Sequence, residues 1–245
     1  SIPVPQFFQM GAYRTAAELG LRNPMFYYDL SQEYASFGRK EKGFDFVMKS
    51  FDLDSLSAGP RSSWYWWRYS DSIWIERFLN RIPPGSYYGT IIAALNYNFG
   101  LSDSTRAEKL LQTAIALQPA SGAAYVKLGQ FKLRDRQKSL EFLRKALPLE
   151  FHEANSMLTG AQVSLGLEDF RLAFQYFKRI LGLNMVPRIV VLKGMGMAYE
   201  QKKDRQAAYA SYIEMDRVCP KAILCSWWGH EAASSMSIAY ADKGD

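Results

Sequence analysis

Four small residues recur along this sequence at nearly constant intervals, and this period is the strongest constraint on its fold. They are separated by 32, 34 and 35 residues, and each stands four positions before a large apolar side chain. The four are Ala107, Ser139, Ala173 and Ala208. A period of about 20–50 residues marks a repeat protein, in which each unit buries its apolar face only against its neighbours. The period therefore predicts a stack of similar units.

The clearest copy of the unit occupies residues 190–220. Gly196 lets a second helix approach the first closely, and Ala208 is expected to meet it there. Two tyrosines fill the space between the helices, and a closing proline ends the second helix because it lacks a backbone N–H. The elements in order are Leu192, Met195, Gly196, Tyr199, Ala208, Tyr212 and Pro220.

This pattern resembles the tetratricopeptide repeat (TPR), a helix hairpin of about 34 residues. The resemblance covers residues 87–245 well and 6–53 loosely. It implies an all-α fold, an α-solenoid of about five to six antiparallel helix hairpins in a right-handed superhelix. We expect N-terminal helices with a divergent hairpin over residues 1–84, and TPR-like repeats over 85–245, the last of them incomplete.

Proline and glycine delimit the individual helices in this sequence. After an extended lead-in, helical patterns alternate with short turns. The helices expected before the third hairpin cover residues 6–19, 25–37, 41–53, 62–81, 87–99 and 104–117.

The segment 62–81 departs from the repeat pattern and predicts a long aromatic helix. Its indole side chains are Trp64, Trp66, Trp67 and Trp74. Three interpretations stay open. The helix could be a core element or cap of the solenoid, a second contact for a protein partner, or a helix at a membrane surface. Asp71 and Glu76 among the aromatics count against deep insertion into a membrane.

No arrangement of residues in this chain points to catalysis. The chain has two histidines, and neither lies in a catalytic or metal-binding spacing. Nucleophile elbows, phosphate loops and zinc-protease motifs are absent from the sequence. The segment Gly194-Met195-Gly196 falls inside an expected helix, which favours close packing over dinucleotide binding. We therefore expect no enzyme activity, no cofactor and no metal site.

Two cysteines lie close together near the C-terminus. Cys219, Cys225 and His230 fit no common zinc spacing. Three interpretations of the cysteines stay open: two buried thiols, a disulfide that closes the turn, or part of a metal site. The disulfide would need an oxidising compartment.

The net charge is +6, and three basic clusters are expected at turns inside hairpins. They begin at Arg39, Arg134 and Lys202. Solvated turns are one interpretation, and a basic edge for an acidic partner is the other. Nucleic acid is disfavoured, because stacking on bases would need aromatic residues interleaved with this edge.

In a TPR-like solenoid the first helix of each hairpin lines the concave face. The residues placed there by helical phase are mostly small or apolar, which suits an amphipathic helix or an extended peptide. They are Val126, Gln130, Met157, Ala161, Ser164, Lys193 and Met197. Some TPR proteins grip an acidic chain end with Lys and Asn on this face. Gln130, Ala161 and Met197 stand where those Asn residues would be, which argues against such a clamp.

These observations predict a non-catalytic scaffold or adaptor that binds a protein or peptide partner and serves as a subunit of an assembly. Two alternatives remain: an accessory domain of a cell-envelope complex for secretion, pili or polysaccharide export, or the binding domain of a larger enzyme. The chain begins at Ser1 and stops within a repeat, so we expect a trimmed product or a fragment. Exported and cytoplasmic locations both fit the sequence. No apolar run approaches the roughly 20 residues of a membrane-spanning helix.

Overall fold

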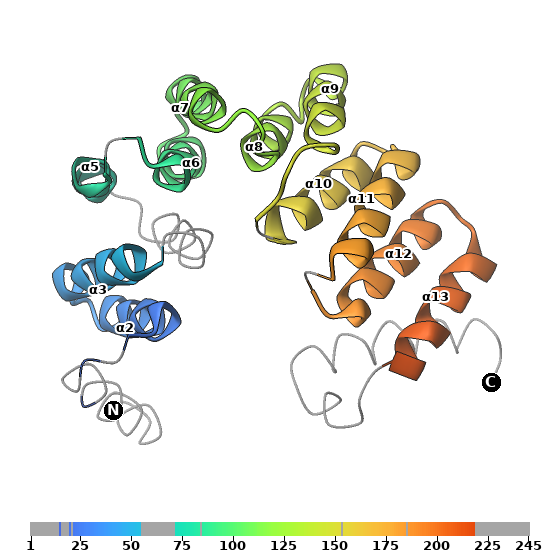
Figure 1. Ribbon diagram of the computed structural model, residues 1–245, viewed down its shortest axis with the longest axis horizontal. Helices are drawn as coiled ribbons and strands as arrows, with labels where there is room; N and C mark the ends of the chain where they lie inside the picture. Colours follow the sequence, from blue (N-terminus) through green and yellow to red (C-terminus); the bar gives the residue numbers. More distant parts are fainter. Residues whose placement is uncertain are drawn as a thin grey trace. The chain divides into compact units, whose positions relative to one another are not determined.

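The computed structural model describes residues 15, 20, 22–54, 72–83, 85–152, 154–184 and 186–218. Within these residues every regular element is a helix (Figure 1), which confirms the all-α prediction. The helices are α2 (Pro24–Ser36), α3 (Lys40–Leu53), α5 (Ser72–Arg81), α6 (Tyr87–Leu95), the π-helix η1 (Asn96–Gly100), α7 (Ser104–Leu117), α8 (Ala123–Phe131), α9 (Arg136–Ala146), α10 (Ala154–Gly166), α11 (Phe170–Leu183), α12 (Arg188–Gln201) and α13 (Arg205–Val218). Apart from residue 15, the expected helix over 6–19 lies outside the described residues, and so does the first half of 62–81.

Five antiparallel hairpins are formed by the described helices, and they agree with the expected pairs. The pairs are α2–α3, α6–α7, α8–α9, α10–α11 and α12–α13. The segment Gly194-Met195-Gly196 lies in the middle of α12, as expected for a packing element.

An aspartate caps the second helix of four of these hairpins. Its carboxylate accepts a hydrogen bond from the backbone N–H three residues later, at 3.0–3.1 Å, in α7, α9, α11 and α13. The four caps are Asp103, Asp135, Asp169 and Asp204. Each such bond satisfies one of the free N–H groups at a helix N-terminus. The α3 helix differs, because Arg39 stands at its cap and makes no side-chain cap bond.

The chain divides into two compact units, Ser1–Ala120 and Ser121–Asp245. The first unit includes α6 and α7, and the predicted start of the regular repeats at residue 85 stays a prediction. One apolar cluster of this unit joins Val47 of α3, Phe78 of α5 and Ile92 of α6. On the surface of this unit an ion pair joins α5 to α3. The Nη1 atom of Arg77 donates to both carboxylate oxygens of Glu41 at 2.8 Å.

The second unit stacks three hairpins, α8 to α13. Its main apolar cluster runs through the α8–α9 and α10–α11 hairpins and reaches Val191 and Ala198 of α12. Tyr176 of α11 links two hairpins, because its ring is fully buried and its hydroxyl donates a hydrogen bond of 2.7 Å to the carbonyl of Leu143 in α9. Burial raises the pKa of the Tyr176 hydroxyl above its ordinary value.

Glycines on the first helices make room for aromatic rings of the second helices. A Cβ added to Gly160 would lie 2.7 Å from the ring atoms Cε1 and Cζ of Tyr176. At Gly196 the three atoms nearest to an added Cβ all belong to Tyr212, so Gly196 accommodates this ring, whereas the sequence analysis placed Ala208 against it. The small residue is buried as predicted, but the close approach occurs four residues further along α13.

Candidate partner-binding surface

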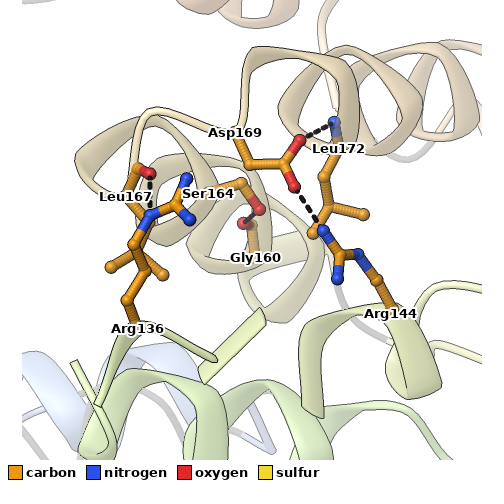
Figure 2. A network of polar contacts seen from close by, with 7 residues as sticks. All are labelled: Arg136, Arg144, Gly160, Ser164, Leu167, Asp169 and Leu172. Carbon is orange, nitrogen blue, oxygen red and sulfur yellow. Dashed lines mark hydrogen bonds and ion pairs between the residues drawn. The ribbon is translucent and has the colours of Figure 1, made fainter. Parts of the chain in front are cut away.

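Four of the seven residues assigned to the groove are core residues in the structure. Their exposed fractions are 0%, and they are Val126, Met157, Ala161 and Ser164. The physical reason is that α8 packs directly against α10, which encloses the side chains between these two first helices. The hydroxyl of Ser164 is also used internally, since it donates a hydrogen bond of 2.7 Å to the carbonyl of Gly160 (Figure 2).

The other three assigned residues are accessible. Met197 on α12 is 43% exposed, although it is a large apolar side chain. Lys193, one turn earlier on α12, is half-buried. Gln130 on α8 is also half-buried, and its side-chain oxygen is buried without a hydrogen-bond donor among the residues described. Whether these side chains touch a partner stays a prediction.

A buried side-chain amide in the α6–α7 hairpin, that of Asn96, was not identified from the sequence. Asn96 lies 11 residues before Ala107, the same distance that separates Met197 from Ala208. It is the first residue of the π-helix η1, it is 0% exposed, and both polar atoms of its amide lack a hydrogen-bond partner in the described structure. The register of the small residues could have identified it, because that register assigns Asn96 to the first-helix face. Its complete burial distinguishes it from Met197.

The basic clusters lie at hairpin turns, as predicted. Arg136 of the second cluster and the nearby Arg144 both make contacts within the chain. The Nε–H of Arg136 donates a hydrogen bond of 3.0 Å to the carbonyl of Leu167 at the end of α10 (Figure 2). Arg144 pairs with the cap Asp169 at 2.8 Å. Both arginines belong to α9, so the contacts tie that helix to the next hairpin. Arg136 is therefore only partly available to an acidic partner.

The pKa of Asp135, the aspartate that caps α9, is also perturbed. The backbone N–H of Lys138 donates to its carboxylate, and the Lys138 ammonium lies 3.2 Å away. These contacts lower the pKa of Asp135, so its negative charge persists next to the basic turn. The turn consequently carries both signs of charge.

The described part of the aromatic segment contributes to the core of the first unit. Trp74 packs against Phe44 of α3, with ring centroids 5.3 Å apart, and Arg77 lies over its ring at 4.9 Å. Ile75 and Phe78 are fully buried. These contacts agree with the interpretation of the segment as a core element. Trp64, Trp66 and Trp67 lie outside the described residues, and their proposed second contact stays a prediction.

The described residues show neither a metal site nor a membrane-spanning helix. Where the structure describes the chain, no group of three His, Cys, Asp or Glu residues is arranged to hold a metal ion. None of the described helices is long and apolar enough to cross a membrane. Cys219, Cys225 and His230 lie outside the described residues, so their three interpretations stay open.

Comparisons with known proteins identify the fold. No family model matches the sequence, and no curated protein matches it. Among solved structures, the chain resembles the C-terminal part of a TPR repeat-containing protein from Cytophaga hutchinsonii, with a TM-score of 0.50 and 11% identity over 98% of this chain and 85% of that chain.

Two further structures are similar at lower scores. The APC/C hetero-tetramer Cut9–Hcn1 gives a TM-score of 0.47 and 14% identity over 98% of this chain, which spans only 40% of the Cut9–Hcn1 chain. YrrB, a TPR protein with an unusual peptide-binding site, gives 0.41 and 15% identity over 87% of this chain and 95% of its own. The Cytophaga match and the five hairpins together show that this chain has the tetratricopeptide-repeat fold, an all-α solenoid.

Proposed function

We propose that this chain is a non-catalytic interaction scaffold that holds a peptide or a helix of a partner protein on the first helices of its second unit. The observation that carries the proposal is the exposure of Met197 on α12, in a unit whose other described large apolar first-helix residues are buried or half-buried. A flexible, polarizable thioether adapts to irregular apolar surfaces and is common at binding surfaces for helices and peptides.

The neighbouring polar residues suit the same partner. Lys193 stands four residues before Met197, so the two side chains lie on one face of α12. On α8 the side chain of Gln130 is half-buried, and an amide can donate to or accept from the backbone of an extended peptide. The net charge of +6 favours a partner with acidic residues. The non-catalytic part of the proposal rests on the sequence, which lacks paired nucleophile and base motifs.

The proposal is tested by affinity capture with three forms of the chain: wild type, Met197→Glu and Leu183→Glu. Leu183 at the end of α11 is 49% exposed, so the control places the same charge on an exposed apolar position of a second helix. We expect a partner that binds wild type and Leu183→Glu but binds Met197→Glu at least about tenfold more weakly, since truncated anchors in an interface often cost about 2 kcal/mol.

Met157 is unsuitable for this test. Its side chain is fully buried, so a glutamate there would disrupt the core and any lost binding would reflect unfolding. Circular dichroism of Met197→Glu must match wild type before the capture is interpreted. A partner retained equally by all three forms would contradict the proposal and direct attention to Trp74 and the first unit.

A further inference from the structure

Arg179 on α11 is the only arginine among the described residues that is half-buried, whereas the others are exposed. Its Nη1 atom is buried and has no hydrogen-bond partner within the described structure. Several other arginines of the second unit bind acidic side chains, such as Arg144 with Asp169 and Arg188 with Glu214. A guanidinium N–H group that is removed from water without an acceptor is costly, because it loses its hydration.

A fixed aromatic ring holds the Arg179 guanidinium in place. The guanidinium carbon lies 5.5 Å from the ring centroid of Phe151, in the connection between α9 and α10. Phe151 is only 8% exposed, and a Cβ added to Gly122 would lie 2.6 Å from its Cε2 atom, so the ring packs tightly against the start of α8. The backbone N–H of Gly122 also donates a hydrogen bond of 2.8 Å to the carbonyl of Glu150.

Three acidic residues of the second unit bind other cations. Glu141 binds Lys145 at 2.7 Å, Asp169 binds Arg144, and Glu214 binds Arg188. The nearby Tyr176 hydroxyl donates to the carbonyl of Leu143 and stays neutral, because burial raises its pKa although the Arg179 charge opposes this. Arg179 is therefore preorganised next to an aromatic ring, and its charge is not balanced by these groups.

We propose that Arg179 and Phe151 form a binding site for an oxyanion, either a carboxylate or a phosphate. A ring against one face of a guanidinium leaves its N–H groups directed in the plane, where both kinds of oxyanion bind with two parallel hydrogen bonds. This goes beyond the proposed scaffold function, since the site belongs to a second helix and an inter-hairpin connection. Gln130, Lys193 and Met197 belong to the first helices α8 and α12.

The test follows the side-chain Nε–H resonances of the arginines by NMR during titration of the whole chain. Sodium glutarate and sodium phosphate are the two probes, each compared with sodium chloride at equal ionic strength. Three variants accompany wild type: Arg179→Gln, Arg179→Lys and Arg171→Gln. Arg171 is the matched control, because it lies on the same helix and is exposed.

We expect one or both probes to shift the Arg179 resonance with saturation, and a probe that acts alone identifies the anion as carboxylate or phosphate. The same probe should raise the melting temperature of wild type and of Arg171→Gln. Arg179→Gln should bind it at least about tenfold more weakly, and Arg179→Lys should also lose most of the affinity, since an ammonium lacks the planar fork. The site is refuted if neither probe shifts this resonance beyond the chloride control, or if Arg179→Gln responds like wild type.

Discussion

Replacement of Gly160 by alanine tests the packing that defines the hairpins of the second unit. Gly160 is in the middle of α10 and faces the ring of Tyr176 on α11. An alanine Cβ there would lie 2.7 Å from Cε1 and Cζ, whereas ordinary van der Waals contacts begin near 3.4 Å. The ring would have to move by several tenths of an ångström. Its fully buried position and the hydrogen bond to Leu143 oppose that movement.

The size of the effect follows from three contributions. Inserting a methyl group into a packed core costs about 1–3 kcal/mol. Weakening the Tyr176 hydrogen bond adds about 0.5–1.5 kcal/mol. Alanine regains about 1 kcal/mol over glycine inside a helix. We therefore expect Gly160→Ala to lower the free energy of unfolding by about 2 kcal/mol.

Urea unfolding followed by circular dichroism measures this change, and the chain supplies a control. An added Cβ at Gly182 of α11 meets nothing within 4 Å, so Gly182→Ala should be neutral or stabilising by up to about 1 kcal/mol. The same substitution thus has opposite signs at the two sites. In a Tyr176→Ala background the cost of Gly160→Ala should disappear. If Gly160→Ala is as stable as wild type, the glycine is not needed for the approach of the ring.

Two further predictions concern Asp169 and Tyr176. Asp169→Ala should cost about 1–2 kcal/mol of unfolding free energy, because it removes the cap of α11 together with the Arg144 pair, whereas Arg144→Ala should cost less than about 1 kcal/mol. Equal losses in urea unfolding would show that the cap contributes nothing. Burial raises the pKa of Tyr176 in the folded state, so stability is fully present below the ordinary value of 10.0 and falls as the pH rises above it. Tyr176→Phe should show a smaller loss of stability between neutral pH and pH values above 10.0, and an unchanged loss would argue against this linkage.

The helices could be predicted from the sequence because their signals are local. Proline, glycine and the spacing of small residues delimit α2, α3, α6 and α7 to within a few residues. The four caps were also readable, although the sequence analysis overlooked them. Asp103, Asp135, Asp169 and Asp204 each stand four residues before a small residue and therefore repeat with the same period.

The candidate surface was predicted less well, because burial depends on contacts between hairpins. Helical phase alone assigned Met157 and Met197 to the same face, yet α8 packs on α10 and encloses Met157, while Met197 is exposed. Arg179 gave no local signal, since its position depends on Phe151, which is 28 residues away in the sequence. Contacts between residues so far apart in the sequence depend on how one hairpin packs against the next.

The shared register of caps and small residues explains why degenerate repeats still fold in one way. The aspartate fixes the residue at which the second helix begins, and the small residue follows one turn later at a buried position. The divergent hairpin supports this view, since Gly43 is buried four residues after Arg39 at the start of α3. Arginine provides no acceptor there and places a positive charge at the positive end of the helix dipole. We expect α3 to gain its stability mainly from the burial of Phe78 of α5 against it, since the Arg77–Glu41 pair is exposed and such pairs contribute little.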